Sequence, residues 1–311
     1  MYYLIFPLFY LASLLPMWLL YGLSDGLAFL LYSVFRYRRG VVMTNLGIAF
    51  PEKTDREREA IAKSFYRNFT DNFIETIKLV SASPAFLQDR FVLDNPGVLE
   101  EYYARGQKVQ LHMGHLFNWE IPGVAMPLWT RYTFIVIYMP IENKAIDRLY
   151  RYLRGRLGTV LLPATNMQRA ILPYRNSQYM LTLVADQVPS GPERSYWLNF
   201  FGQPTPFVRT PERGARIANI PAVFVRIYRT RRGHYRAELT TISDQPANLP
   251  EGELTRRYRQ MLEDAIRREP ASYLWSHRRW KKVFDTRHVP LWIDETPAPP
   301  AAPFPEASPK P

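Results

Sequence analysis

Leu111-His112-Met113-Gly114-His115-Leu116-Phe117-Asn118-Trp119-Glu120 is the stretch of the chain from which its fold can be worked out. The apolar run from Val109 to Met113 predicts a buried strand. Asn118 or Glu120 can cap a helix that begins near Pro122, because proline is tolerated in the first turn of a helix. The stretch therefore predicts a strand, a short loop and a helix, the repeating corner of an α/β protein.

The same stretch places a histidine five residues before a carboxylate. Histidine has an unperturbed pKa near neutrality, so His115 can take a proton from a hydroxyl while Glu120 orients the imidazole. On one continuous helix the two side chains would lie roughly 140° apart, so a strand-to-helix corner suits them better. A histidine and a glutamate at this spacing also occur by chance, and a purely structural pair is the alternative.

Strands and helices alternate through most of the remaining chain. Apolar runs predict strands at 109–113, 132–139, 159–162, 179–185, 222–228 and 235–242. Helices are predicted at 144–156, 165–174, 211–218 and 253–268. This order is typical of an α/β fold with a mixed central sheet flanked by helices, in which sites form at the carboxyl ends of strands. His115 and Asp186 both follow such ends.

Composition limits the chemistry. The 311 residues contain no cysteine, which excludes disulfides, thiol nucleophiles and cysteine metal sites. No phosphate-binding loop, dinucleotide fingerprint or metal motif is found, so the sequence predicts neither a cofactor nor a metal. The formal net charge of +12 indicates an acidic partner, which is nucleic acid, an anionic membrane surface or an acidic protein.

The N-terminus favours the membrane among these partners. Residues 1–35 are almost wholly apolar, with Asp25 as their only charge, and Arg36, Arg38 and Arg39 follow at once. This run is long enough to span a bilayer, and its basic flank comes after it, unlike that of a signal peptide. We expect a membrane anchor over 1–39 with the rest of the chain in the cytoplasm, since basic flanks remain inside. A pair of buried core helices is the alternative.

Two later helices have distinctive surfaces. Thr54 and Glu57 fit a capping box that opens an amphipathic helix over 54–81. Its predicted apolar stripe is Ile61, Phe65, Phe69, Phe73 and Ile77. The helix over 144–156 carries a cationic stripe of Lys144, Arg148, Arg151 and Arg154, suited to lipid phosphates or anionic headgroups, or simply a solvated face. Arg156 lies off this stripe and can turn inward.

Residues 40–290 are therefore expected to form the main domain. The segment 291–311 is rich in proline and alanine and is predicted to be a disordered tail.

Several segments, taken in order, carry a family resemblance. They are the apolar N-terminus with its basic flank, Asn45-Leu46 to Pro51, Glu75-Thr76-Ile77-Lys78-Leu79, His115 to Glu120, Asp186-Gln187, Phe200-Phe201-Gly202 and Trp275-Ser276-His277-Arg278-Arg279-Trp280. Together they resemble the late lauroyl- and myristoyl-type acyltransferases of lipid A biosynthesis in Gram-negative bacteria. These belong to the glycerolipid acyltransferase superfamily, marked by a His-x4-Asp/Glu motif that His115 and Glu120 match.

The resemblance implies a function and roles for residues. It implies acyl transfer from an acyl carrier protein thioester to a hydroxyl of a phosphorylated lipid A precursor, at the cytoplasmic face of the inner membrane. His115 would be the general base, Glu120 its orienting partner, and no acyl-enzyme would form. Arg154 and Arg156 both match a family arginine linked to the site. Asp186, Gln187 and Asn118 are expected to contact substrate or line its site.

Other functions remain open from the sequence. A related acyltransferase could act on a lysophospholipid or an amino-acid lipid, and coenzyme A could replace the carrier protein as donor. A non-catalytic, basic membrane-binding protein is the more distant alternative. Nucleic acid is not an expected partner of a chain with this apolar N-terminus.

Overall fold

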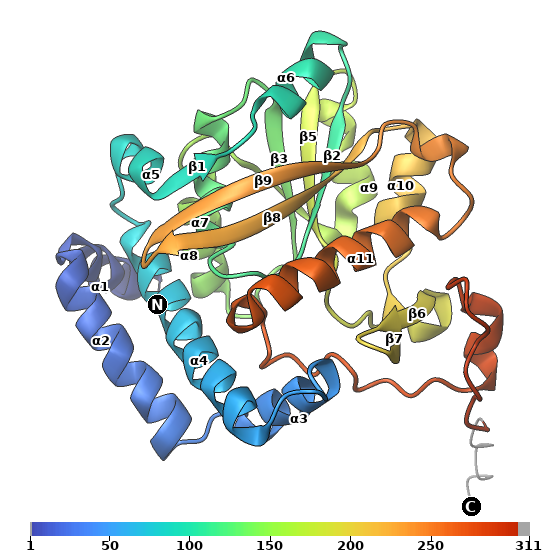
Figure 1. The fold of residues 1–311 in the computed structure, drawn as a ribbon. Coiled ribbons are helices and arrows are strands. Elements are labelled where there is room, and N and C mark those ends of the chain that lie inside the picture. The colour runs from blue at the N-terminus through green and yellow to red at the C-terminus, as the bar shows by residue number, and fades with distance from the viewer. Residues whose placement is uncertain (1, 304–311) are drawn as a thin grey trace, which may run out of the picture.

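Strand β2 (Val109–Met113) lies inside a seven-stranded mixed sheet, and all five of its residues are buried. In the computed structural model, which describes residues 2–303, the strand order is β1-β9-β8-β2-β5-β3-β4 (Figure 1). The other strands are β1 (Phe91–Leu93), β3 (Thr133–Tyr138), β4 (Val160–Pro163), β5 (Tyr179–Val184), β8 (Ala222–Arg231) and β9 (His234–Ser243). The neighbours are parallel except for the β8–β9 hairpin. The predicted α/β class is confirmed.

Helices cover both faces of this sheet. In β8, Val223 and Val225 belong to a core shared with α5 (Pro84–Arg90), α6 (Gly97–Ala104), α7 (Glu120–Ala125) and α8 (Lys144–Gly155). Phe224, between them, points to the other face, because side chains alternate along a strand. It packs in a core shared with α3 (Arg39–Ala49), α10 (Thr210–Ala218) and α11 (Glu253–Arg268). The run of apolar residues in each central strand follows from burial on both faces.

The apolar N-terminus forms two helices where one anchor helix was expected. Helix α1 (Tyr2–Leu14) ends just before Pro16, whose ring cannot continue a helix, and α2 (Met17–Phe29) begins there and runs on as a π-helix over Leu30–Val34. Both lie beside α4 (Asp55–Lys78) at one side of the molecule (Figure 1). Within the described residues, Met17–Val34 is a helix long and apolar enough to cross a membrane, and only 22% of it is buried.

Helix α4 begins as predicted, with the Thr54–Glu57 capping box formed in both directions. The predicted apolar stripe is only partly buried: Phe65 is 2% exposed, but Phe73 is 46% exposed. The second half of α4 buries polar side chains in its place, namely Asn68, Thr70, Asp71, Asn72, Glu75 and Thr76. This face packs against α2 and the loop after β2, which supply hydrogen-bond partners that no periodicity reveals.

Two segments differ from the predicted secondary structure. The helix predicted over 165–174 is a 3₁₀ turn, α9 (Met167–Ala170) and a second 3₁₀ turn containing Pro173. A hairpin of β6 (Tyr196–Phe200) and β7 (Gln203–Phe207) was not predicted, because β7 carries two prolines.

Residues 291–303, the described part of the predicted tail, contact the main domain at two points. The Asn199 backbone N–H donates to Asp294 at 2.6 Å, and Ala302 pairs with Asp285. The end of the predicted tail, 304–311, lies outside the described residues.

Candidate active site

The sheet brings His115 and Asp186 together. His115 follows β2, and Asp186 follows β5, the parallel neighbour of β2, so the loops after both strands leave the same edge of the sheet. His115 Nδ1 lies 2.6 Å from Asp186 Oδ1, and the His115 backbone N–H donates to Asp186 Oδ2 at 3.1 Å. At Gly114, just before His115, the chain lies close to α11, since a Cβ atom there would lie 2.5 Å from the Leu262 side chain. A carboxylate thus fixes both the backbone and the ring of His115.

Asp186 is held as an anion inside the protein. Its side chain is 1% exposed, and such burial by itself raises the pKa of a carboxyl. The His115 imidazole and backbone N–H outweigh burial and, with the more distant Arg279 guanidinium, hold the pKa of Asp186 below its ordinary value. Arg279 is fully buried, beneath the rings of Phe207 and Phe200. The charges of Asp186, Arg279 and a protonated His115 are therefore coupled.

The five-residue spacing predicted that Glu120 orients His115, but in the structure Glu120 has another partner. It forms a bidentate ion pair with Arg154, with Nε–Oε2 and Nη2–Oε1 distances of 2.7 and 2.5 Å. The carboxylate is 7% exposed and the guanidinium 19% exposed, so the pair is largely desolvated. Arg154 was predicted on the outer cationic stripe of α8, but it turns inward. The carboxylate in contact with the histidine is Asp186, which lies far away in the sequence.

Asn118 positions the backbone that carries Glu120. Its Oδ1 atom accepts hydrogen bonds from the backbone N–H groups of Glu120 and Ile121, at 2.9 and 3.1 Å, which satisfies the start of α7 as predicted for a cap. Its amide nitrogen donates to Glu75 Oε2 at 2.7 Å. The side chain is 1% exposed and fully used in these contacts, so Asn118 supports the site from behind and does not line the cavity.

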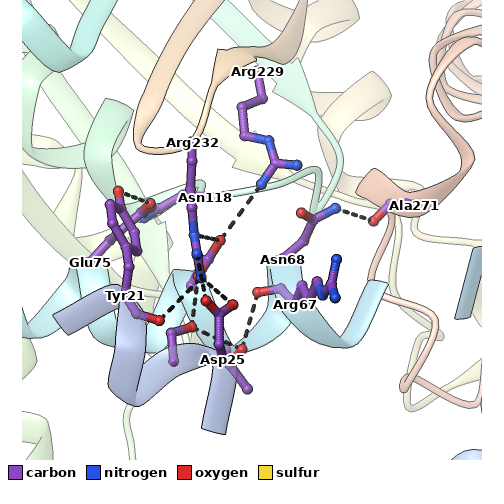
Figure 2. A network of polar contacts seen from close by, with 12 residues as sticks. Tyr21, Asp25, Arg67, Asn68, Glu75, Asn118, Arg229, Arg232 and Ala271 are labelled. Atoms are coloured by element: carbon purple, nitrogen blue, oxygen red, sulfur yellow. Dashed lines mark hydrogen bonds and ion pairs between the residues drawn. The ribbon is translucent and has the colours of Figure 1, made fainter. Parts of the chain in front are cut away.

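Glu75 is the centre of a buried polar network between α2, α4 and the sheet (Figure 2). It accepts hydrogen bonds from Tyr21 of α2, Asn118 of the β2–α7 loop and Tyr235 of β9, at 2.9, 2.7 and 2.8 Å. Burial, only partly offset by these donors, raises the pKa of Glu75 to about 7. A neighbouring cluster joins Asp25, Asp71 and Arg232, so the N-terminal helices are tied to the domain by charged groups.

The remaining predicted site residues divide between the cavity and the scaffold. Gln187 Nε2 lies 3.4 Å from His115 Nε2, at the open side of the imidazole. Arg156 points away from the site and donates to the backbone carbonyls of Leu79 and Ala82. It ties α8 to the end of α4, so of the two candidate arginines only Arg154 is at the site.

His277 was given no definite role from the sequence, but it lies close to this centre. Its Nε2 atom accepts a hydrogen bond from the Val188 backbone N–H at 3.1 Å, two residues after Asp186. Burial, together with the nearby Arg279, lowers the pKa of His277 to about 4. It is therefore a neutral acceptor that fixes the loop after β5. His112 is buried in β2, and burial lowers its pKa to about 4 as well.

A cavity of about 540 Å³ opens at His115. Its polar lining includes His115, Glu120, Arg154 and Gln187, and its apolar lining comes from both faces of the sheet. Leu111, Met113, Met126, Phe134 and Val136 contribute from one face, and Ile137, Leu181 and Leu183 from the other. The volume is in the range of small-molecule sites. Within residues 2–303, no group of three or more metal-ligating acids or histidines is found.

A sequence model of the family described as "Bacterial lipid A biosynthesis acyltransferase" matches residues 1–282. The chain belongs to that family. It is therefore an O-acyltransferase of lipid A and lipopolysaccharide biosynthesis. The segments quoted in the sequence analysis, taken in the order in which they occur, implied the same family.

The acyltransferase is similar to curated proteins of the same kind. It is 23% identical over 244 residues to the "Lipid A biosynthesis acyltransferase" of Haemophilus influenzae, which covers 76% of this chain and 74% of the relative. It is 24% identical over 164 residues to the "Lipid A biosynthesis myristoyltransferase" of Escherichia coli K12, covering 53% of this chain and 50% of the relative. A "Lipid A biosynthesis acyltransferase 2" of Shigella flexneri is 24% identical over 157 residues, half of this chain and 49% of the relative. The chain thus matches about half the length of the latter two.

Proposed function

We propose that this acyltransferase moves a fatty acyl chain from an acyl carrier protein thioester to a hydroxyl of a phosphorylated lipid A precursor, with His115 as the general base. The observation that carries the proposal is the pairing of His115 with the buried Asp186 at the mouth of an apolar cavity. Asp186 holds the proton on Nδ1, which leaves Nε2 as the basic nitrogen toward the cavity. This is the arrangement that a hydroxyl nucleophile requires.

The reaction balances without a covalent enzyme intermediate. The acceptor hydroxyl gives its proton to His115 Nε2 while its oxygen attacks the thioester carbonyl. The tetrahedral intermediate collapses with cleavage of the carbon–sulfur bond, and the leaving thiolate takes the proton back from the imidazolium. Asp186 stabilises that imidazolium, and the Arg154 guanidinium in the cavity wall supplies positive charge near the developing oxyanion.

The cavity lining supports direct transfer, because within the described residues it includes neither serine nor cysteine. The chain has no cysteine. Ser24, in the sequence Gly22-Leu23-Ser24-Asp25-Gly26 that resembles a hydrolase elbow, lies in α2 and is buried, with hydrogen bonds to Thr70 and Asp71. It has neither the strand-to-helix turn nor the exposure that such a nucleophile needs.

The N-terminal helices support a location at the inner membrane. Large apolar side chains of α1 and α2 face outward, among them Leu4, Leu8, Leu11, Trp18 and Phe29. Such a surface suits the acyl-chain region of a bilayer, and Arg36, Arg38 and Arg39 follow it, as expected on the cytoplasmic side. The domain would then meet its lipid acceptor from the cytoplasmic face.

The test is an assay of the purified protein with acyl carrier protein thioesters and a tetra-acylated, phosphorylated lipid A precursor. We expect one added acyl chain by mass spectrometry, and loss of at least about a hundred-fold in kcat for His115→Ala. His234→Ala, at the β8–β9 turn and outside the cavity, is the matched control and keeps its activity.

Three results contradict the proposal. Transfer to lysophospholipid or amino-acid lipid acceptors, with the lipid A precursor left unchanged, moves the function to the related enzymatic alternative. Full activity of His115→Ala would show that His115 is not the general base. Activity with coenzyme A thioesters, and none with acyl carrier protein thioesters, would show that the carrier protein is not the donor.

A further inference from the structure

A basic hollow lies outside the cavity, on the opposite side of helix α10. Its volume is about 640 Å³, and its lining includes four arginines and a single carboxylate, Glu251. The arginines are Arg194, Arg209, Arg213 and Arg216. At the rim stands Ile217, a large apolar side chain that is 76% exposed. An arginine-rich surface around an exposed apolar residue is typical of sites that bind another macromolecule.

The positive charge of this hollow is mostly uncompensated. Glu251 is engaged by Arg209 and by the hydroxyl of Tyr196, so it neutralises one arginine of the four. Arg194 and Arg213 are exposed, and within residues 2–303 neither side chain has a hydrogen bond or ion pair. The Nε atom of Arg216 is buried, and no partner for it is found among the described residues. The guanidinium groups of Arg194 and Arg213 are therefore available to an acidic ligand, and Arg216, which also interacts with Glu251, adds positive charge beside them.

Helix α10 separates this hollow from the catalytic cavity. Pro211 and Gly214, three residues apart on one face of the helix, line the cavity. Arg213, Arg216 and Ile217 form the opposite face and line the hollow. Thr210, at the start of the helix, belongs to both linings. A ligand bound in the hollow is thus one helix away from the entrance of the apolar cavity.

The hollow is not on the side of the apolar N-terminal helices. In Figure 1, α10 lies across the sheet from α1 and α2, which occupy the opposite flank of the molecule. A surface beside α10 therefore does not face a bilayer that holds α1 and α2. It is open to an acidic partner that arrives from solution.

We propose that Arg194, Arg209, Arg213, Arg216 and Ile217 form the docking surface for the acidic carrier protein that delivers the acyl chain. This inference rests on the proposed function, which it extends from the donor thioester to the surface that receives its carrier. The carrier's acidic face meets the arginines, its apolar residues contact Ile217, and its flexible thioester arm passes Thr210 into the cavity. Opposite charges of this kind chiefly raise the association rate and select the partner.

The experiment compares two donors that carry the same acyl chain, the acyl carrier protein thioester and the protein-free acyl-pantetheine thioester. For Arg194→Glu/Arg213→Glu we expect kcat/KM for the carrier, relative to kcat/KM for acyl-pantetheine, to fall about ten-fold or more at low salt. The deficit shrinks at high salt, where the wild-type advantage is screened. The matched control is Arg105→Glu. Arg105 is exposed, follows α6 and lines neither the cavity nor the hollow, so the ratio of this variant stays at the wild-type value.

If acyl-pantetheine is too small to be turned over, binding of the carrier protein is measured instead of the ratio. Fluorescence anisotropy of labelled acyl carrier protein reports its affinity directly, and thermal melting checks that each variant is folded. An unchanged ratio together with unchanged affinity overturns the docking surface while leaving the proposed function intact. So does a loss confined to binding of anionic lipid vesicles, which would make the hollow a membrane contact. A wild-type protein that does not use the carrier thioester at all overturns the proposed function itself.

Discussion

Asp186 Oδ1 lies 2.6 Å from His115 Nδ1, although 71 residues separate the two in the sequence. The carboxylate five residues from the histidine, Glu120, binds Arg154. The site therefore contains two carboxylates with different tasks. Asp186 contacts the imidazole and the backbone N–H of His115, and Glu120 holds a guanidinium in the cavity wall.

The first prediction concerns Asp186→Asn. The substitution keeps the size of the side chain but removes the charge that stabilises the imidazolium, and its amide no longer enforces a proton on Nδ1. We expect kcat to fall by about three to four orders of magnitude, as for the same change in other aspartate-oriented histidines. Steady-state assays on a variant shown to be folded by circular dichroism check this. A loss of less than about ten-fold would show that Asp186 is structural only.

The second prediction concerns the Glu120–Arg154 pair. Removing one partner of a buried ion pair leaves an uncompensated charge, so we expect Glu120→Gln and Arg154→Met each to reduce the free energy of unfolding by about 3 kcal/mol. The double variant leaves no unpaired charge and should be less destabilised than the sum of the two. Urea unfolding of the four proteins gives the coupling energy. Additive losses would mean that the pair is not coupled.

The strands were predictable because the central sheet is buried on both faces. Runs such as Val109–Met113 and Tyr179–Val184 are continuously apolar, and the turn chemistry between 228 and 235 marks the β8–β9 hairpin. The β6–β7 hairpin escaped prediction because Pro204 and Pro206 conceal an edge strand. The single anchor expected over 1–39 is divided at Pro16 into two helices.

Five of the residues expected at the site lie at the cavity or beside it, namely His115, Glu120, Arg154, Asp186 and Gln187. Asn118 and Arg156, also expected there, do not line the cavity, and the pairing among the five depends on the strand order. Sequence spacing favoured the near carboxylate, whereas the β2–β5 pairing brings the distant one to His115. The parallel strand ends before His115 and Asp186 were the available signal. Glu75 and Arg279 lie in two segments that carry the family resemblance, but nothing in those segments marked either residue as buried, since burial of a charged residue depends on tertiary partners.

The third prediction is a pH dependence of stability that arises from Glu75. Its pKa is about 7 in the folded protein and 4.5 in an unfolded chain. As pH rises from about 4.5 to about 7, the unfolded chain releases this proton before the folded protein does. The free energy of unfolding should therefore fall by up to about 3 kcal/mol across this interval and level off above it.

Urea unfolding at closely spaced pH values measures this fall, and Glu75→Gln should remove it. Tyr21, Tyr235 and Asp71 face the same carboxyl. Burial raises the pKa of both tyrosines above its ordinary value near 10, so neither tyrosine titrates between these pH values. Glu57→Gln, at the exposed start of the same helix, is the control and should retain the fall. A flat profile for the wild-type protein would show that Glu75 is ionised throughout.

The last prediction concerns the length of the acyl chain. Gly123 of α7 lines the cavity, and a Cβ atom there would meet no other atom within 4 Å, so a larger side chain can extend into the open space. Gly123→Leu should shorten the preferred chain by roughly two to four methylenes, since each buried methylene contributes about 0.8 kcal/mol. Competition among carrier thioesters of different length, with the products read by mass spectrometry, measures the preference. Gly97→Leu, at the exposed start of α6, should leave it unchanged. If both variants keep the wild-type preference, the acyl chain does not occupy the part of the cavity beside α7, and the lobe lined by Leu181 and Leu183 on the other face of the sheet must hold it.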